Sequence, residues 1–142
     1  MNIEEYREYC IRKPGVTEGF PFDSNTLVFK VMGKMFALAD VELFRSINLK
    51  CDPDRAIQLR ESYEGIKPGY HMNKQHWNTV DTDGSVGDKL LYELIDHSYM
   101  LIVDSLPKKL KEELANYEES EIPFSSHFPT FVYSTFGVQR GK

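Results

Sequence analysis

The feature that most constrains the fold is a pair of β-prone runs joined by a glycine-containing turn. The runs are Leu27–Val31 and Met35–Ala39, and the sequence between them is Met-Gly-Lys. Gly33 adopts a positive φ without the steric cost of a Cβ atom, so the turn predicts a tight antiparallel hairpin. The chain therefore contains an antiparallel sheet, and the helical patterns elsewhere make it an α/β (α+β) chain.

Apolar residues at helical spacing predict four helices. Their expected buried stripes are, in chain order, Ile3, Tyr6 and Cys10, then Ala56, Leu59 and Tyr63, then Leu90, Leu91, Leu94, Ile95 and Leu101, and finally Leu110 and Leu114. The helix starts are indicated by Asn2, by Asp52-Pro53, by a capping box of Ser85 and Asp88, and by Pro107. Pro14-Gly15 and Gly65 are expected to end the first two helices.

Two further strands are expected, one on each side of the second helix. Leu43–Cys51 alternates Leu43, Arg45, Ile47, Leu49 and Cys51 with Phe44, Ser46, Asn48 and Lys50. One face of this strand should pack and the other should be wetter. Gln75–Val80 alternates His76, Asn78 and Val80 with Gln75, Trp77 and Thr79, and Asp81 to Gly84 then turn the chain.

Size and charge limit the function classes. The chain has 142 residues, the size of one ordinary domain, and no apolar run long enough for a membrane span or a secretion leader. A cytoplasmic location is therefore expected, and Cys10 and Cys51, which form no metal or redox motif, are expected to be reduced core residues. The net charge of −5 disfavours strong nonspecific binding to nucleic acid, although residues 50–80 carry a net charge of +1.

The stretch Pro68 to Asp81, PGYHMNKQHWNTVD, has a high density of candidate binding groups. On a nucleic-acid surface its lysine and histidines would contact phosphates and base edges, while Trp77 or Tyr70 stacks on a base. As a structural element, Trp77 would pack in the core and the asparagines would bond backbone groups around a Pro-Gly bend. The core role is favoured for Trp77, because a large aromatic side chain in a half-buried strand usually packs.

Four segments occur together in a characteristic order. They are FPFDSNTLVFKVMGKMFAL, INLKCDP, PGYHMNKQHWNTV and SYMLIVDSLPKKL, which span residues 1 to about 115 with their flanks. In this combination the chain resembles the MmcQ/YjbR-like family of small bacterial proteins, and HMNKQHWNTV is the most distinctive piece. The resemblance implies a curved antiparallel sheet, helices packed on one side, and a double-wing arrangement associated with DNA binding. Residues 1–117 are therefore expected to form one MmcQ/YjbR-like domain.

Together, the residues and the resemblance predict a non-catalytic binding module with DNA as the leading partner. The residues expected to contact nucleic acid or another ligand are Lys30, Lys34, Lys50, Lys67, His71, Asn73, Lys74 and His76. The alternative is a protein partner or a small acidic ligand bound in the same polar groove. Binding of DNA should weaken steeply with salt, whereas binding that is indifferent to salt would favour the alternative.

No catalytic residue, metal site or cofactor is expected. The sequence contains no nucleophile elbow, Walker loop or dinucleotide-type glycine motif. His71 and His76 match no compact zinc spacing, and Asp81 to Gly84 begins like a calcium loop without the remaining ligands. An acid–base site around His71, Lys74 and His76 is the remaining enzyme hypothesis, and it is not favoured.

Residues 118–142 form a C-terminal extension outside the resemblance. It contains an acidic bridge followed by two prolines and five aromatic residues. This composition is too apolar for an ordinary solvated end, so the extension is expected to pack on its own domain or on a second subunit. Packing on a second subunit would make the protein a homo-oligomer.

Overall fold

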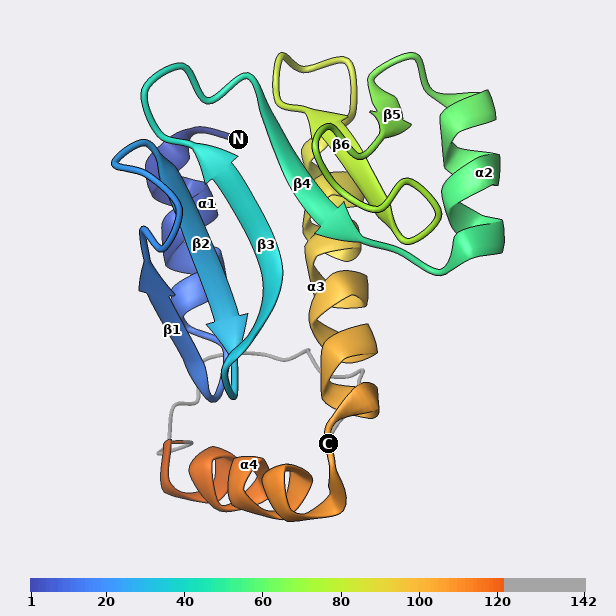
Figure 1. The fold of residues 1–142 in the computed structure, drawn as a ribbon. Helices are drawn as coiled ribbons and strands as arrows, with labels where there is room; N and C mark the ends of the chain where they lie inside the picture. Colours follow the sequence, from blue (N-terminus) through green and yellow to red (C-terminus); the bar gives the residue numbers. More distant parts are fainter. Residues whose placement is uncertain (122–142) are drawn as a thin grey trace.

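The computed structural model describes residues 1–121, and the side chains of residues 1–117, as an α+β fold. The elements are α1 (Ile3–Ile11), β1 (Val16–Gly19), β2 (Thr26–Val31), β3 (Lys34–Asp40), β4 (Ser46–Lys50), α2 (Pro53–Ser62), β5 (Ile66–Pro68), β6 (Trp77–Asp81), α3 (Asp88–Ser105) and α4 (Lys108–Glu121). The six strands form one antiparallel sheet in the order β1-β2-β3-β4-β6-β5 (Figure 1). The expected antiparallel sheet with accompanying helices is confirmed.

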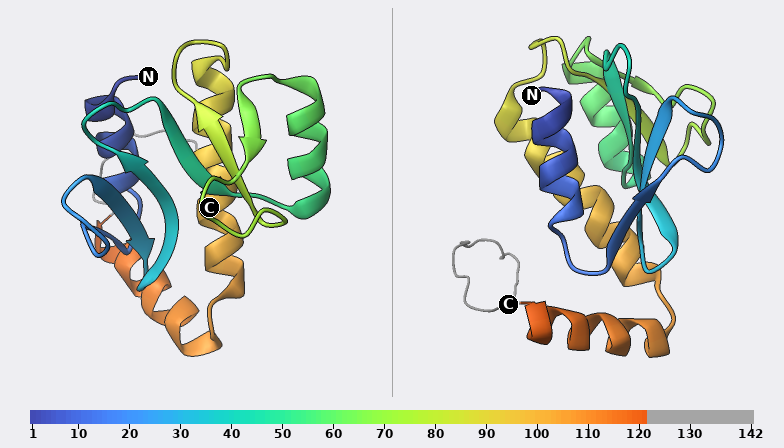
Figure 2. Two further views of the ribbon diagram at one scale, coloured as in Figure 1. Left: turned by 45° about the horizontal axis from the view of Figure 1, so that its top comes forward. Right: turned by 90° about the vertical axis from the view of Figure 1, so that its left-hand side faces the viewer.

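The helices lie on one side of this sheet. Tyr6 from α1, Leu59 from α2, Ile95 from α3 and Leu114 from α4 all belong to one hydrophobic core with the strand residues of that side. In the side view of Figure 2, α1 and α3 stand on one side of the strands, and no helix of residues 1–121 lies on the other side. We call this second side of the sheet the open face.

Local signals placed the first helix and the hairpin correctly. The side chain of Asn2 accepts a hydrogen bond from the backbone N–H of Glu5, and the Glu5 side chain bonds back to complete a capping box. Met32 and Gly33 have φ values of 49° and 87°. Positive φ at both central residues is the geometry of a type I′ turn, whose twist matches that of the flanking strands.

The second helix begins where predicted, but its buried residues end at Leu59, one position earlier in the stripe than expected. Asp52 caps it by accepting the N–H of Arg55, and Pro53 is its first residue. Ala56 and Leu59 are buried as expected. The prediction that Tyr63 is buried was wrong, because Tyr63 is the extended residue that ends the helix, and its side chain is 38% exposed.

The strand expected over residues 43–51 is confirmed only from Ser46 to Lys50. Ile47 and Leu49 are buried on the helix side, which agrees with the predicted alternation. Leu43 was expected on the same packed face, but it precedes the strand in a turn and is 61% exposed. The chain leaves the β conformation there because Phe44 has a φ of 45°.

Two start points predicted around the third helix were displaced. Strand β6 begins at Trp77, two residues later than expected, and ends at Asp81. The capping box of Ser85 and Asp88 was wrong, since α3 starts at Asp88 with Gly87 as its N-cap residue and without a side-chain cap. The Ser85 hydroxyl instead donates a hydrogen bond of 2.6 Å to the Asp83 carboxylate in the preceding turn.

The sheet has two strands that sequence patterning missed, β1 and β5. They are short and contain few apolar residues, VTEG in one and IKP in the other. Both lie at an edge of the sheet, where each pairs with a single neighbour. Pro68 is compatible with such an edge position, because proline has no N–H to donate to a further strand.

The last helices and the cysteines agree with expectation. Leu91, Leu94 and Ile95 of α3 and Leu114 of α4 are buried, while Leu90, Leu101 and Leu110 are half-buried. Cys10 and Cys51 are free thiols in the core. Within residues 1–121, no helix has both the length and the apolar character needed to cross a membrane. The predicted packing of the C-terminal extension concerns residues that lie almost entirely outside the described part.

Candidate functional site

Strand pairing aligns one residue from every strand in a row across the open face. The row consists of Gly19, Val28, Leu38, Asn48, Thr79 and Lys67. Two positions further along their strands on the same face lie Lys30, Lys50 and Trp77. Because directly paired residues of an antiparallel sheet point to the same side, three predicted ligand-binding lysines share this face.

The middle of the open face is apolar. Val28, Leu38 and Trp77 form a second hydrophobic cluster, separate from the helix-side core, and Met35 and Met72 pack against it. Trp77 is only 9% exposed, so the interpretation of Trp77 as a core residue is confirmed. A base cannot stack on this buried ring without displacing its neighbours.

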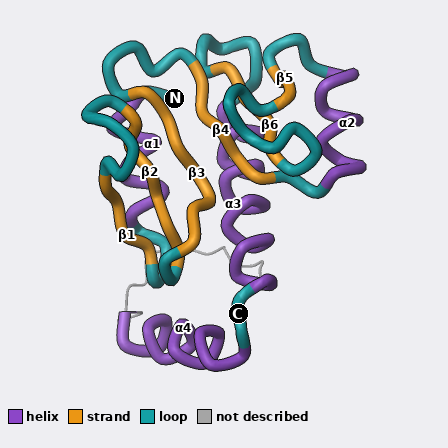
Figure 3. The backbone as a smooth tube through the Cα atoms, in the orientation of Figure 1, coloured by secondary structure: helices purple, strands orange, loops and turns teal. Residues whose placement is uncertain are grey.

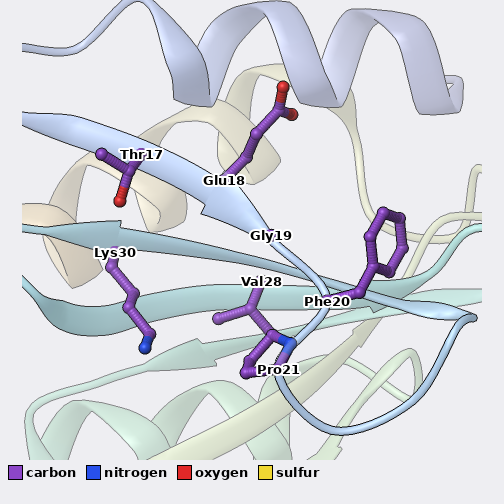
Figure 4. Close-up of a pocket in the computed structure, with 7 residues that line it drawn as sticks. All are labelled: Thr17, Glu18, Gly19, Phe20, Pro21, Val28 and Lys30. Atoms are coloured by element: carbon purple, nitrogen blue, oxygen red, sulfur yellow. The ribbon is translucent and has the colours of Figure 1, made fainter.

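Lys30 lies at the edge of a hollow on this face. The hollow has a volume of about 290 Å³ and is lined by Thr17, Glu18, Gly19, Phe20, Pro21, Val28 and Lys30. Figure 4 shows the side chains of Thr17 and Lys30 on the same side of the strands, with the Phe20 ring and the Glu18 carboxylate turned away from them. The Glu18 carboxylate accepts a hydrogen bond of 2.7 Å from Nε of Arg7 in α1.

The lysines of the open face differ in their electrostatic surroundings. Lys67 forms an exposed ion pair with Asp81, with 2.8 Å between Nζ and Oδ2. Lys30 and Lys50 are half-exposed and make no ion pair or side-chain hydrogen bond with any residue of the described part. Their ammonium groups are therefore the ones most available to an anionic ligand.

The remaining predicted residues lie elsewhere. Lys34 pairs with Val31 at the hairpin end, and Val31 belongs to the helix-side core, so Lys34 is separated from Lys30 by the sheet. His71 is exposed in the loop between β5 and β6, and His76 lies in the turn just before β6. The structure thus groups Lys30, Lys50 and Lys67 but does not add Lys34 or His76 to that group.

Figure 3 shows the loop between β5 and β6, residues 69–76. Side-chain hydrogen bonds of Asn73 and Lys74 hold this loop in shape. The Asn73 side chain accepts the backbone N–H groups of Gln75 and His76, at 2.9 and 3.2 Å. The ammonium group of Lys74 donates to the carbonyl of Gly69 at 2.9 Å. Replacing Lys74 would therefore disturb the loop as well as remove a charge.

Arg60 of α2 supports the loop from the helix side of the sheet, a role that the sequence did not reveal. Its Nε donates to the side-chain oxygen of Asn78 at 2.7 Å, and its guanidinium also bonds the carbonyls of Lys74 and Trp77. Asn78 is buried, and its amide nitrogen has no hydrogen-bond partner in the part of the chain that the structure describes. Arg60 thus connects α2, the 69–76 loop and the start of β6.

The 69–76 loop rests on polar side chains of the open face. The N–H of Tyr70 donates to the Thr79 hydroxyl at 2.9 Å, and the amide of Asn48 donates to the Tyr70 carbonyl at 3.4 Å. The Thr79 hydroxyl donates in turn to the Asn48 side-chain oxygen at 2.5 Å. The sequence predicted that Asn48 lies on the more polar face of its strand. It could not identify Thr79 and Tyr70 as the residues that Asn48 contacts there.

A second polar cluster joins α1 to α3 on the helix side. The Asp96 carboxylate accepts the Tyr9 hydroxyl at 2.8 Å and lies 2.5 Å from the ammonium of Lys13. Burial and the neighbouring Asp96 charge raise the pKa of Tyr9 above its ordinary value, so this phenol keeps its proton at an alkaline pH that would ionise a free tyrosine. Lys13 also lies over the rings of Tyr9 and Tyr99. The cluster is fully occupied by its own contacts and serves helix packing.

The described residues offer little for metal or acid–base chemistry. No three His, Cys, Asp or Glu side chains among them gather as metal ligands. His71 is exposed in the loop and His76 lies in the turn before β6, while the Lys74 ammonium is bonded to a carbonyl. Among the described residues, the open face presents the ammonium groups of Lys30 and Lys50 beside an apolar centre. The 69–76 loop adds the exposed ring of Tyr70.

The family model that matches this chain is YjbR, over residues 11–101. The uncharacterized protein YjbR of Escherichia coli K12 is 36% identical over 115 residues, which cover 80% of this chain and 98% of that protein. The uncharacterized protein YyaQ of Bacillus subtilis is 40% identical over 55 residues, 39% of this chain and 46% of its own length. Both relatives are described only as uncharacterized proteins.

Two solved structures share both sequence and fold with the chain. A Deinococcus radiodurans protein described as a DUF419 domain is 40% identical with a TM-score of 0.76, covering 80% of this chain and 88% of that one. A Pseudomonas syringae protein solved by NMR is 30% identical with a TM-score of 0.59, covering 71% and 92%. The predicted resemblance is confirmed, and the chain belongs to the YjbR family.

Proposed function

We propose that this protein is a non-catalytic binding module whose open face binds DNA. The pair Lys30 and Lys50 supports this most directly. Neither ammonium group has a partner among the described residues, and no helix of residues 1–121 covers their face of the sheet. Phosphate groups are bound chiefly by such cations, and a broad sheet face can accommodate an extended polyanion. Lys67 adds a third ammonium group, whose charge is shared with Asp81.

Polar groups of the 69–76 loop support a binding role over a catalytic one. Asn73 and Lys74 are used to shape the loop, and the ring of His71 packs against Tyr70. General acid–base catalysis needs proton donors and acceptors that converge on one reacting atom. The groups named in the sequence as acid–base candidates are instead distributed around the loop.

The test is fluorescence anisotropy of a labelled 20-base oligonucleotide, single-stranded and as a duplex, across a salt series. The double variant Lys30→Ala/Lys50→Ala should bind more weakly. Each lost phosphate contact should reduce the slope of log K against log salt by about 0.7 to 0.9.

The matched control is Lys108→Ala/Lys109→Ala, which removes two exposed lysines from α4, away from the open face. Both double variants change the net charge equally, so only the position of the charge differs. An equal loss of affinity in the two variants would show that the open face is not the site. No binding by the wild-type protein at low salt and micromolar concentration would eliminate DNA as the ligand.

A second candidate ligand is a small carboxylate or other small anion in the hollow beside Lys30. The volume of about 290 Å³ and the combination of Lys30, the Thr17 hydroxyl and the apolar Val28 favour it. An NMR titration with benzoate checks this: saturable shifts confined to the amides of Thr17, Val28 and Lys30, and abolished by Lys30→Ala, would support this ligand class. Uniform, unsaturable shifts would exclude benzoate binding there.

A further inference from the structure

We infer that the open face takes single-stranded rather than duplex DNA, with the ring of Tyr70 as the surface on which a base stacks. This inference rests on the proposed function, because it specifies the form of DNA bound by the same face. Its starting point is the exposure of Tyr70. The Tyr70 side chain is 69% exposed, although its backbone belongs to a loop with many internal hydrogen bonds.

The backbone of Tyr70 is held from both sides by the sheet. Its N–H donates to Thr79 and its carbonyl accepts from Asn48, and these two residues face each other across β4 and β6. The preceding Gly69 donates its N–H to the carbonyl of Trp77 at 2.8 Å. An aromatic ring on such a fixed backbone loses little conformational entropy when a ligand stacks on it.

His71, the next residue, has an unusual backbone conformation. Its φ is 60°, a left-handed conformation that is unfavourable for residues with a Cβ atom. The ring of His71 lies 4.0 Å from that of Tyr70, centroid to centroid, with 50° between their planes. The turn therefore packs the histidine against one side of the tyrosine and limits the orientations available to its ring.

Lysines flank the point where Tyr70 is anchored. Lys50 is two residues along β4 from Asn48, a distance of about 7 Å along a strand. Lys67 pairs directly with Thr79 on the other side of β6. A base stacked on Tyr70 would thus have its own phosphates within reach of ammonium groups from two strands.

The single-stranded form follows from which base surfaces are accessible. In a duplex both faces of an internal base are covered by its neighbours, whereas a single strand offers them to an aromatic side chain. A chain with a net charge of −5 and few lysines on this face gains less from phosphate contacts than a basic protein does. Stacking supplies the missing affinity, and only the single strand permits it.

The experiment compares three labelled ligands of equal length by anisotropy at low salt, using the full chain. They are a thymidine strand, an abasic strand with the same phosphates, and a hairpin duplex. The variants are Tyr70→Ala, Tyr70→Phe, which keeps the ring, and Tyr63→Ala, which removes another exposed tyrosine at the end of α2.

The wild-type protein should bind the thymidine strand more tightly than the duplex or the abasic strand. Tyr70→Ala should weaken binding of the thymidine strand by about 5- to 150-fold, the range for one stacked base, and leave the abasic strand unaffected. Tyr70→Phe and Tyr63→Ala should retain wild-type affinity.

Two results would overturn the inference in different ways. Duplex binding that equals or exceeds strand binding, with no effect of Tyr70→Ala, would remove the stacking role while leaving DNA as the ligand. An equal effect of Tyr70→Ala on thymidine and abasic strands would show that the variant acts through loop structure. If none of the three ligands binds, the proposed function fails together with this inference.

Discussion

At the scale of single residues, Arg60 connects α2 to the 69–76 loop and to β6. It supplies the hydrogen bond to the buried Asn78 side chain and two more to carbonyls of the loop and β6. In Arg60→Ala the side-chain oxygen of Asn78 would lose the donor that it accepts from and would be buried without a partner. We expect the free energy of unfolding to fall by about 1 to 3 kcal/mol, measured by urea denaturation.

Gln58 provides the matched control for this prediction. It is an exposed residue of the same helix, and Gln58→Ala should change the free energy of unfolding by less than about 0.5 kcal/mol. If Arg60→Ala were no more destabilising than Gln58→Ala, the contacts of Arg60 would contribute nothing net to stability.

His97 gives a pH-dependent prediction at the same scale. Its Nε2 accepts the backbone N–H of Asp52 at 3.1 Å, so the imidazole is neutral there. Burial, and secondarily the charge of Arg55, lower the pKa of His97 below its ordinary value of 6.5, while Asp52 opposes the shift. A lowered pKa means that the unfolded chain binds the proton first. The stability from this site should therefore be present above pH 6.5 and be lost as the pH falls below it.

The variant His97→Gln tests this, because glutamine can accept the same N–H and does not titrate. Urea denaturation between pH 7.5 and pH 5 should show a steeper loss of stability for the wild-type protein than for His97→Gln. Parallel pH dependences in the two proteins would refute a titrating role for His97.

At the scale of elements, α4 packs on the domain through Leu114, and the half-buried Leu110 of the same helix also contacts the core. Leu114 is buried in the helix-side core, and its Cδ1 lies 2.6 Å from the position that a Cβ atom on Gly15 would occupy. This close approach, together with the φ of +72° at Gly15, requires glycine at the turn after α1. The turn at Gly15 and α4 therefore pack closely through Leu114.

Leu114→Ala should lower the free energy of unfolding by about 2 to 5 kcal/mol, because it removes buried methyl groups and leaves a cavity. Hydrogen exchange should show the largest loss of protection in α4. Leu43→Ala makes the same chemical change at an exposed position and should have little effect. Equal destabilisation by the two substitutions would mean that α4 is not docked through Leu114.

At the scale of the whole molecule, the helix-side core connects elements far apart in the chain. Cys10 of α1 and Cys51 at the end of β4 both lie in this core, and burial raises the pKa of both thiols above their ordinary value. Since the thiolate is the reactive form, neither cysteine should react with a thiol reagent at pH 8 in the native protein.

Labelling followed by mass spectrometry checks whether the core opens as one unit. Both thiols should become reactive at the same rate, and at the same urea concentration as global unfolding. Rapid labelling of Cys51 alone in native buffer would instead show that the end of β4 opens independently of the core.

Features controlled by a few neighbouring residues could be predicted from the sequence. The Asn2 and Asp52 caps, the hairpin turn at Gly33 and the alternation of Ile47 and Leu49 are of this kind. Ser85 was mistaken for a cap because α3 begins three residues later, at Asp88, and the Ser85 side chain belongs to the preceding turn, where it bonds the Asp83 carboxylate. Strand β5 could not be found because three residues become a strand only when β6 lies beside them.

In the candidate site, too, some features could be predicted from the sequence and others depend on the fold. Its lysines could be named from the sequence, but strand register decides which of them share a face, and it separates Lys34 from Lys30. The role of Arg60 depends on residues 14 to 18 positions away that approach it only in the folded chain.

The sequence by itself determined the α+β class, the family and the positions of most helices and strands, because these follow from short-range periodicity, turn chemistry and motif order. Only the tertiary structure decided which lysines share the open face, that the 69–76 loop rests on Asn48 and Thr79, and that Tyr70 stands exposed. Those outcomes depend on pairing between distant strands, and a contact between distant residues has no signature in the local sequence of either partner.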